Sequence, residues 1–116
     1  MTAADLARSL RGGELSPREA VQHYLDRIEA LDGAVNAYIT VRAEEALAEA
    51  DALEREPRRG PLWGVPVAVK DVVDVAGTPT TAASRILADN VADGDAHVVA
   101  RLRAAAVRRE WSGVPW

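Results

Sequence analysis

The chain alternates between stretches with apolar residues at helical spacing and stretches rich in β-branched residues. Apolar residues that recur three and four positions apart predict helices at 3–11, 17–31, 43–56 and 95–107. The second of these carries the clearest stripe, formed by Ala20, Val21, Tyr24, Leu25, Ile28 and Leu31. We expect this stripe to pack into the core, because an apolar face at this spacing is buried against neighbouring elements.

Two helix starts have the sequence signature of a capping box. Thr2 and Asp5 are three residues apart, and so are Ser16 and Glu19, so each pair can exchange side-chain and backbone hydrogen bonds. Pro17 suits the first helical position after Ser16. Gly12-Gly13 predicts the end of the first helix, Gly33 the end of the second, and Asp95 the N-cap of the fourth. The third helix has an acidic side, predicted to be a solvated face, that consists of Glu44, Glu45, Glu49, Asp51 and Glu54.

Two stretches favour strands. Residues 35–42 contain Tyr38, Ile39, Thr40 and Val41, and residues 65–75 contain six valines. These valines are Val65, Val67, Val69, Val72, Val73 and Val75. A continuous β-branched run predicts a strand that is covered on both faces. Together the elements predict an α/β fold in which helices pack on an incomplete mixed sheet.

Lys70 lies within the second predicted strand and is the only lysine among 14 Lys and Arg residues. Arginine stays charged at any accessible pH, whereas a lysine can lose its proton when it is buried and can then act as a base. One interpretation is therefore a functional base at this position, and the other is a surface lysine at the end of a strand. Alternation along the strand places Lys70 and Asp71 on opposite faces, so we expect no salt bridge between them.

The sequence around Lys70 belongs to a set of ordered blocks. GPLWGVPVAVKDVVDVAGTPTTAAS, at 60–84, resembles the N-terminal region of the amidase signature family. LSPREAVQHYLDRIEALD at 15–32, NAYITV at 36–41 and DAHVVARLRAA at 95–105 resemble the same region in the same order. The NAYITV and TTAAS blocks look most like the A subunit of the aminoacyl-tRNA amidotransferases, and stand-alone amidases carry similar blocks. The resemblance therefore leaves both kinds of protein open.

The resemblance implies a reaction and a role for one residue. In this family the lysine of the GxPxxxKD block belongs to a Ser–cis-Ser–Lys catalytic triad, and the matching position here is Lys70. The resemblance implies hydrolysis of a carboxylic amide, or supply of ammonia within an amidotransferase. It implies a small amide substrate and, for an amidotransferase, partner subunits. It implies no metal and no organic cofactor.

The paired serines of this triad have no counterpart in the sequence. None of the four serines, Ser9, Ser16, Ser84 and Ser112, lies in a Gly/Ser-rich loop. We interpret 1–106 as the N-terminal part of an amidase domain and 107–116 as a divergent tail, where polarity and periodicity change together. The tail is consistent with an out-of-frame product of a disrupted gene or with a genuine short protein. We expect the chain alone to be inactive, with a non-catalytic, partner-binding role as the alternative.

Composition excludes several other functions. A net charge of −4 and a pI near 5.1 argue against direct nucleic-acid binding. The absence of cysteine excludes disulfides and cysteine-based metal sites. His23 and His97 fall on polar helix faces without partners at metal-site spacing, so we expect no metal centre. No stretch predicts a membrane span or a secretory signal, and we expect a cytoplasmic location.

Overall fold

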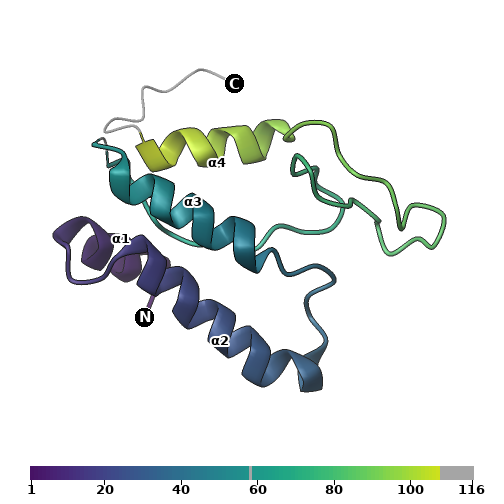
Figure 1. Cartoon of the computed structure of the whole chain (residues 1–116), viewed down its shortest axis with the longest axis horizontal. Helices are drawn as coiled ribbons and strands as arrows, with labels where there is room; N and C mark the ends of the chain where they lie inside the picture. The colour runs from purple at the N-terminus through teal and green to yellow at the C-terminus, as the bar shows by residue number, and fades with distance from the viewer. Residues whose placement is uncertain (58, 108–116) are drawn as a thin grey trace.

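The computed structural model describes residues 1–57 and 59–107, which form four helices (Figure 1). These helices are α1 (Ala3–Gly12), α2 (Pro17–Val35), α3 (Ala43–Arg55) and α4 (His97–Val107). All four predicted helices are confirmed, with boundaries shifted by a few residues. Within this part of the chain, no helix is both long and apolar enough to cross a membrane.

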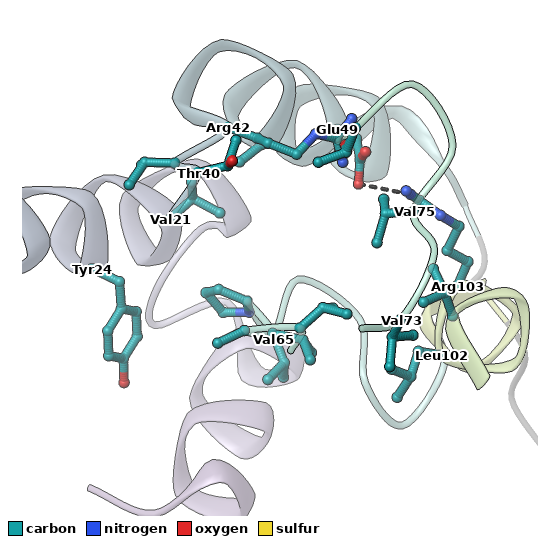
Figure 2. A pocket seen from close by; sticks show the side chains of 18 of the residues that line it. Val21, Tyr24, Thr40, Arg42, Glu49, Val65, Val73, Val75, Leu102 and Arg103 are labelled. Atoms are coloured by element: carbon teal, nitrogen blue, oxygen red, sulfur yellow. Dashed lines mark hydrogen bonds and ion pairs between the residues drawn. The ribbon is translucent and has the colours of Figure 1, made fainter. Parts of the chain in front are cut away.

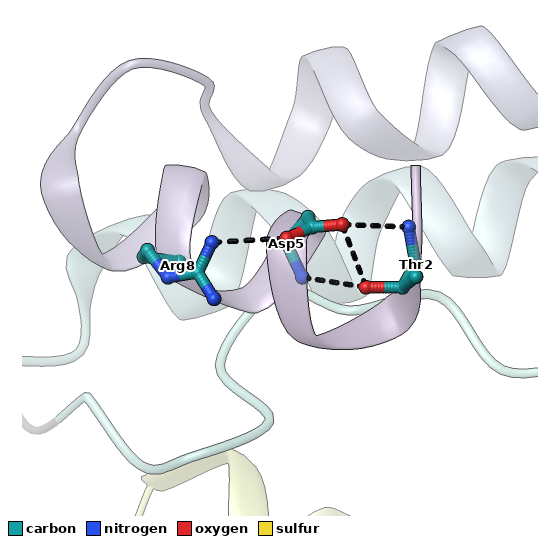
Figure 3. Close-up of polar contacts among 3 residues, drawn as sticks. All are labelled: Thr2, Asp5 and Arg8. Carbon is teal, nitrogen blue, oxygen red and sulfur yellow. Dashed lines mark hydrogen bonds and ion pairs between the residues drawn. The ribbon is translucent and has the colours of Figure 1, made fainter.

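Both predicted capping boxes are formed. At α1, the Thr2 hydroxyl accepts from the Asp5 N–H at 3.1 Å, and the Asp5 carboxylate accepts from the Thr2 N–H at 3.1 Å (Figure 3). At α2, the equivalent bonds between Ser16 and Glu19 are 3.1 and 2.8 Å. Hydrogen bonds from Thr2, together with one from Arg8, lower the pKa of Asp5 to about 2. Each box satisfies N–H groups that the start of a helix leaves without partners.

The helix ends follow the prediction at α1 but not at α2. Gly13 takes the left-handed conformation after α1, with φ of 76°. In α2, however, the helix continues through Gly33, and the left-handed cap is Asn36, with φ of 54°. The Asn36 N–H donates to the carbonyl oxygen of Asp32 at 2.6 Å. The predicted stop at Gly33 is wrong, because asparagine tolerates the left-handed conformation and a helix tolerates an internal glycine when its flanking residues favour the helix.

The sequence predicts Asp95 as the N-cap of α4, but α4 begins two residues later, at His97. The Asp95 carboxylate instead accepts from the Ala76 N–H at 2.8 Å and from Arg103 at 2.9 Å. Arg103 also donates to Glu49 of α3 at 2.8 Å. Asp95 and Arg103 therefore tie α4 to α3 and to the loop around Ala76.

The helix α3 runs alongside α2 (Figure 1), and its acidic side takes part in this packing. Arg18 of α2 donates to Asp51 at 2.7 Å through its guanidinium and to Glu54 at 3.3 Å through its backbone N–H. With Glu49 bound to Arg103, three of the five acidic side chains contact other elements. The prediction of a solvated face is correct for Glu44, Glu45, Glu49 and Glu54, which are exposed, whereas Asp51 is half-buried.

The main core lies where α1, α2 and the 60–65 segment meet. Its buried cluster is Leu6, Leu10, Ala20 and Trp63, with Leu15, Leu53 and Val65 packed around it. The α2 stripe is buried at Ala20 and Val21 but exposed at Tyr24 and Leu31, so the prediction of a core face holds only for the first part of the helix. The core is small because most large apolar side chains beyond this cluster have no element packed over them.

The predicted strands at 35–42 and 65–75 are not formed, which corrects the sheet expected from the sequence. Residue 35 still belongs to α2, and residues 37–42 and 65–75 contain turns and extended backbone but no strand. The described residues contain one isolated antiparallel bridge, between Pro79 and Val91. A strand needs a neighbour for its backbone hydrogen bonds, and neither segment has one in this part of the chain. The four helices are therefore confirmed, and the mixed sheet is not.

Candidate functional site

Lys70 lies at the end of the 65–70 segment, which comes between α3 and α4 in the chain and forms neither helix nor strand. Its carbonyl oxygen accepts from the Val73 N–H at 2.9 Å, which places it at the start of a turn. Its side chain is exposed and makes no hydrogen bond or ion pair within residues 1–57 and 59–107. The expected burial of Lys70 is thus not observed.

Lys70 lines a broad groove with a volume of about 1460 Å³. The walls come from α2, residues 37–42, α3, residues 65–75 and α4. Figure 2 shows Val65 and Val73 on one side of the opening and Val21 on another, with the Glu49–Arg103 ion pair at its edge. The groove is lined mainly by apolar side chains, and Lys70 adds a cation to it. Other charged residues that line it include Arg42, Glu49 and Arg103.

The valines of the 65–75 segment account for much of the apolar lining. Val67, Val69 and Val72 are 52%, 39% and 55% exposed. The backbone N–H and C=O groups of residues 67–69 have no partner among the described residues. This segment therefore keeps the composition of a strand while its hydrogen-bonding groups stay open.

Asp71 is held by a segment ten residues further along the chain. Its carboxylate accepts from the Thr81 N–H at 2.9 Å and from the Thr81 hydroxyl, and its carbonyl oxygen accepts from the Ala82 N–H at 2.9 Å. The hydrogen bonds from Thr81 lower the pKa of Asp71. The sequence pattern assigns no role to Thr81, because nothing in the local spacing indicates a contact across ten residues.

The described serines lie away from the groove. Ser16 caps α2, Ser9 is in α1, and Ser84 donates its backbone N–H to the carbonyl oxygen of Thr81 at 2.8 Å. None of these three lines the groove with Lys70. The predicted tail is 107–116. Val107 is the last residue of α4, and the rest of the tail, including Ser112, lies outside the described residues.

The histidines and carboxylates form no metal site in the described ranges. His23 and His97 are both exposed, in agreement with the sequence prediction. No group of three or more histidine, aspartate or glutamate side chains lies close enough to hold a metal ion there.

Comparison with known proteins decides the family. Residues 19–107 match the Amidase family, and these residues include α4, most of α2 and the whole groove segment. The chain belongs to the Amidase family. The resemblance inferred from the blocks around Lys70 is thereby confirmed.

Two curated relatives place this amidase chain among longer proteins. It is 46% identical over 106 residues to the A subunit of glutamyl-tRNA(Gln) amidotransferase from Thioalkalivibrio sulfidiphilus, covering 89% of this chain and 22% of the relative. It is 50% identical over 103 residues to the same subunit of Thiobacillus denitrificans, covering 86% of this chain and 21% of the relative. The chain thus spans about a fifth of the length of these relatives.

A solved structure shares the arrangement of the helices. It superposes with a TM-score of 0.86 at 36% identity, covering 91% of this amidase chain and 24% of the other chain. That protein is described as a vestigial protein complex that reveals the evolutionary origins of an s-triazine catabolic enzyme. The fold of the described residues is therefore that of part of an amidase-family protein.

Proposed function

We propose that this chain supplies the lysine base of an amidase reaction at a carboxylic amide C–N bond. The observation that carries the proposal is the family match over residues 19–107, together with Lys70 at the lysine position of the GxPxxxKD block. The position of Lys70 at the edge of an apolar groove supports it. In the proposed mechanism, neutral Lys70 takes a proton relayed from a nucleophilic serine through a second, cis-serine. The serine then attacks the amide carbonyl, and water resolves the acyl-enzyme after the amine or ammonia leaves.

We further propose that residues 65–70 form a strand of a mixed sheet in a complete amidase domain. The unpaired backbone groups of residues 67–69 and the exposed valines beside them support this, because both would be satisfied by neighbouring strands. Covering the segment would also bury Lys70, which is the condition for a lysine to act as a base near neutral pH. The same neighbouring strands would thus complete the sheet and bury Lys70 so that it can act as a base.

By itself, the 116-residue chain is proposed to hydrolyse no amide. It holds Lys70, but none of its serines lies in a Gly/Ser-rich loop, so the base has no nucleophile to activate. The names of its relatives support partner subunits for a complete protein, with ammonia supply as the amidotransferase form of the same chemistry. The cytoplasmic location and the lack of direct nucleic-acid binding stay predictions from the sequence.

The test is to join residues 1–106 to the part of the Thioalkalivibrio protein that the match does not cover, and to assay hydrolysis of simple amides. Lys70→Arg keeps the positive charge but removes the base, so the rate should fall by about 100- to 10,000-fold while helix content stays unchanged. Arg27→Lys, on the exposed face of α2, is the matched control and should leave the rate unaltered. Normal turnover of the Lys70→Arg protein would disprove the assignment.

A further inference from the structure

Asp71 and the Thr81–Ala83 segment form a clamp beside Lys70. Two hydrogen bonds join Thr81 to the Asp71 carboxylate, and a third joins the Ala82 N–H to the Asp71 carbonyl oxygen at 2.9 Å. The Thr81 hydroxyl also accepts from the Ala83 N–H at 3.3 Å. The bonds join residues ten positions apart and so close the loop between Asp71 and Thr81.

The clamped segment has an unusual backbone. Ala82 and Ala83 adopt positive φ angles of 48° and 57°, in the left-handed region that disfavours residues with a Cβ. Two such residues in succession persist only where surrounding contacts impose the conformation. The hydrogen bonds to Asp71 and Thr81 are those contacts. Both alanines line the same groove as Lys70.

Lys70 has few other supports. The three residues before it make no backbone hydrogen bonds within the described part of the chain, and its side chain makes no polar contact there. What fixes its backbone is the turn to Val73, at 2.9 Å, and the clamp on the next residue, Asp71. These two contacts are therefore the ones available to hold the backbone at Lys70.

We propose that Asp71 is a positioning residue for Lys70, with Thr81 as its partner. The clamp sets the backbone from which the lysine side chain extends and holds Ala82 and Ala83 beside it. This role in the reaction rests on the proposed function of Lys70 as the base. The geometric part, that the clamp determines the surroundings of Lys70, can be measured on the chain without any activity.

The first test uses the full chain with ¹³C-dimethylated amines, because Lys70 is the only lysine and gives one side-chain signal beside that of the N-terminus. Thr81→Val removes the hydroxyl without changing any charge, so a shift of the Lys70 signal reports geometry. Thr81→Ser keeps the hydroxyl and should restore the wild-type signal. Asp74→Asn, at an exposed carboxylate just after the Lys70–Val73 turn, is the control and should not alter hydrogen exchange at Ala82.

Amide hydrogen exchange is also measured on the wild-type chain, so that the clamp can be tested even if Thr81→Val does not fold. The Ala82 amide should exchange at least about tenfold more slowly than those of Val67 and Ala68, which have no partner in the described structure. Equal exchange at these three amides would overturn the clamp. The positioning role would be overturned if, in folded Thr81→Val, the Ala82 amide exchanges faster but the chemical shift of the Lys70 signal is unchanged.

The second test uses the joined protein described above. Thr81→Val and Asp71→Asn should lower kcat by about 100-fold, with KM nearly unchanged, because a misplaced catalytic group costs about that much. Thr81→Ser should recover most of the rate. Wild-type kcat in both damaging variants would overturn the role of Asp71. If the joined protein without substitutions is inactive, the proposed function of Lys70 is contradicted. The NMR and hydrogen-exchange measurements on the chain would still show whether the clamp forms.

Discussion

The indole N–H of Trp63 donates a hydrogen bond of 3.0 Å to the carbonyl oxygen of Leu53 in the last turn of α3. Trp63 is only 3% exposed and packs against Leu6 and Leu10 of α1. One side chain thus fills the main core and also bonds the end of α3, where the same carbonyl oxygen accepts from the Glu56 N–H at 3.1 Å. Arg59 covers the ring from outside, with its guanidinium carbon 4.3 Å from the ring centre.

We predict that Trp63→Phe destabilises the chain by about 0.5–1.5 kcal/mol, because it keeps an aromatic ring but removes the indole hydrogen bond to the Leu53 carbonyl oxygen, which still accepts from the Glu56 N–H. Trp63→Ala should cost about 3–5 kcal/mol through the cavity it creates. Urea unfolding followed by circular dichroism measures both. Tyr38→Phe, at a residue that is 40% exposed, is the control and should change the free energy of unfolding by less than about 0.5 kcal/mol. Equal stability of Trp63→Phe and wild type would contradict the role of the hydrogen bond.

Two glycines should respond in opposite ways to the same substitution. Gly64 has φ of 75°, and a Cβ there would lie 2.9 Å from Cγ of Pro17, so Gly64→Ala should destabilise by about 1–3 kcal/mol. Gly33 lies inside α2 with open space around it, so Gly33→Ala should stabilise by about 0.5–1 kcal/mol. Thermal unfolding of the two variants provides the comparison. Opposite signs are expected, and a stabilising Gly64→Ala would show that the contact with Pro17 relaxes freely.

The lowered pKa of Asp5 predicts a contribution to stability that depends on pH. Because the folded-state pKa of about 2 lies below the usual value of 3.8, the contribution is present above pH 3.8 and is lost as the pH falls toward 2. Asp5→Asn should therefore lose less stability than wild type between about pH 5 and pH 2. Asp74→Asn, at an exposed carboxylate, is the comparison and should follow the wild-type curve. Parallel curves for Asp5→Asn and wild type would contradict the cap assignment.

The open valine segment predicts self-association of the purified chain. Unpaired backbone groups beside exposed valines form an edge that pairs readily with another chain, and a lysine on such an edge opposes pairing. Val67→Lys should therefore reduce the associated fraction seen by size-exclusion chromatography with light scattering. Ile86→Lys adds the same charge at a residue that is 93% exposed and outside the groove, and it should have a smaller effect. If both variants reduce the associated fraction equally, net charge and not the open edge at 67–69 controls association.

The elements governed by local interactions were predictable from the sequence. The two capping boxes and the four helices depend on residues three or four positions apart, so Thr2 with Asp5 and Ser16 with Glu19 identify them directly. Two local predictions failed. At the end of α2, the choice between Gly33 and Asn36 depended on how far the helix continues. At the start of α4, Asp95 bonds Ala76 and Arg103 and does not cap the helix. Lys70 could also be singled out from the sequence, because it is unique and lies in a recognisable block.

Only the tertiary structure decided the contacts between distant segments. The clamp between Asp71 and Thr81, the bond from Trp63 to Leu53 and the ion pair between Glu49 and Arg103 each join residues that no local pattern connects. Whether the 65–75 segment forms a strand was also decided only by the tertiary structure. Its valines carry a strand preference, but a strand forms only when another segment accepts its backbone hydrogen bonds. Sequence alone therefore determined the composition of the groove and its lysine, and the tertiary structure determined that the segment stays open and Lys70 stays exposed.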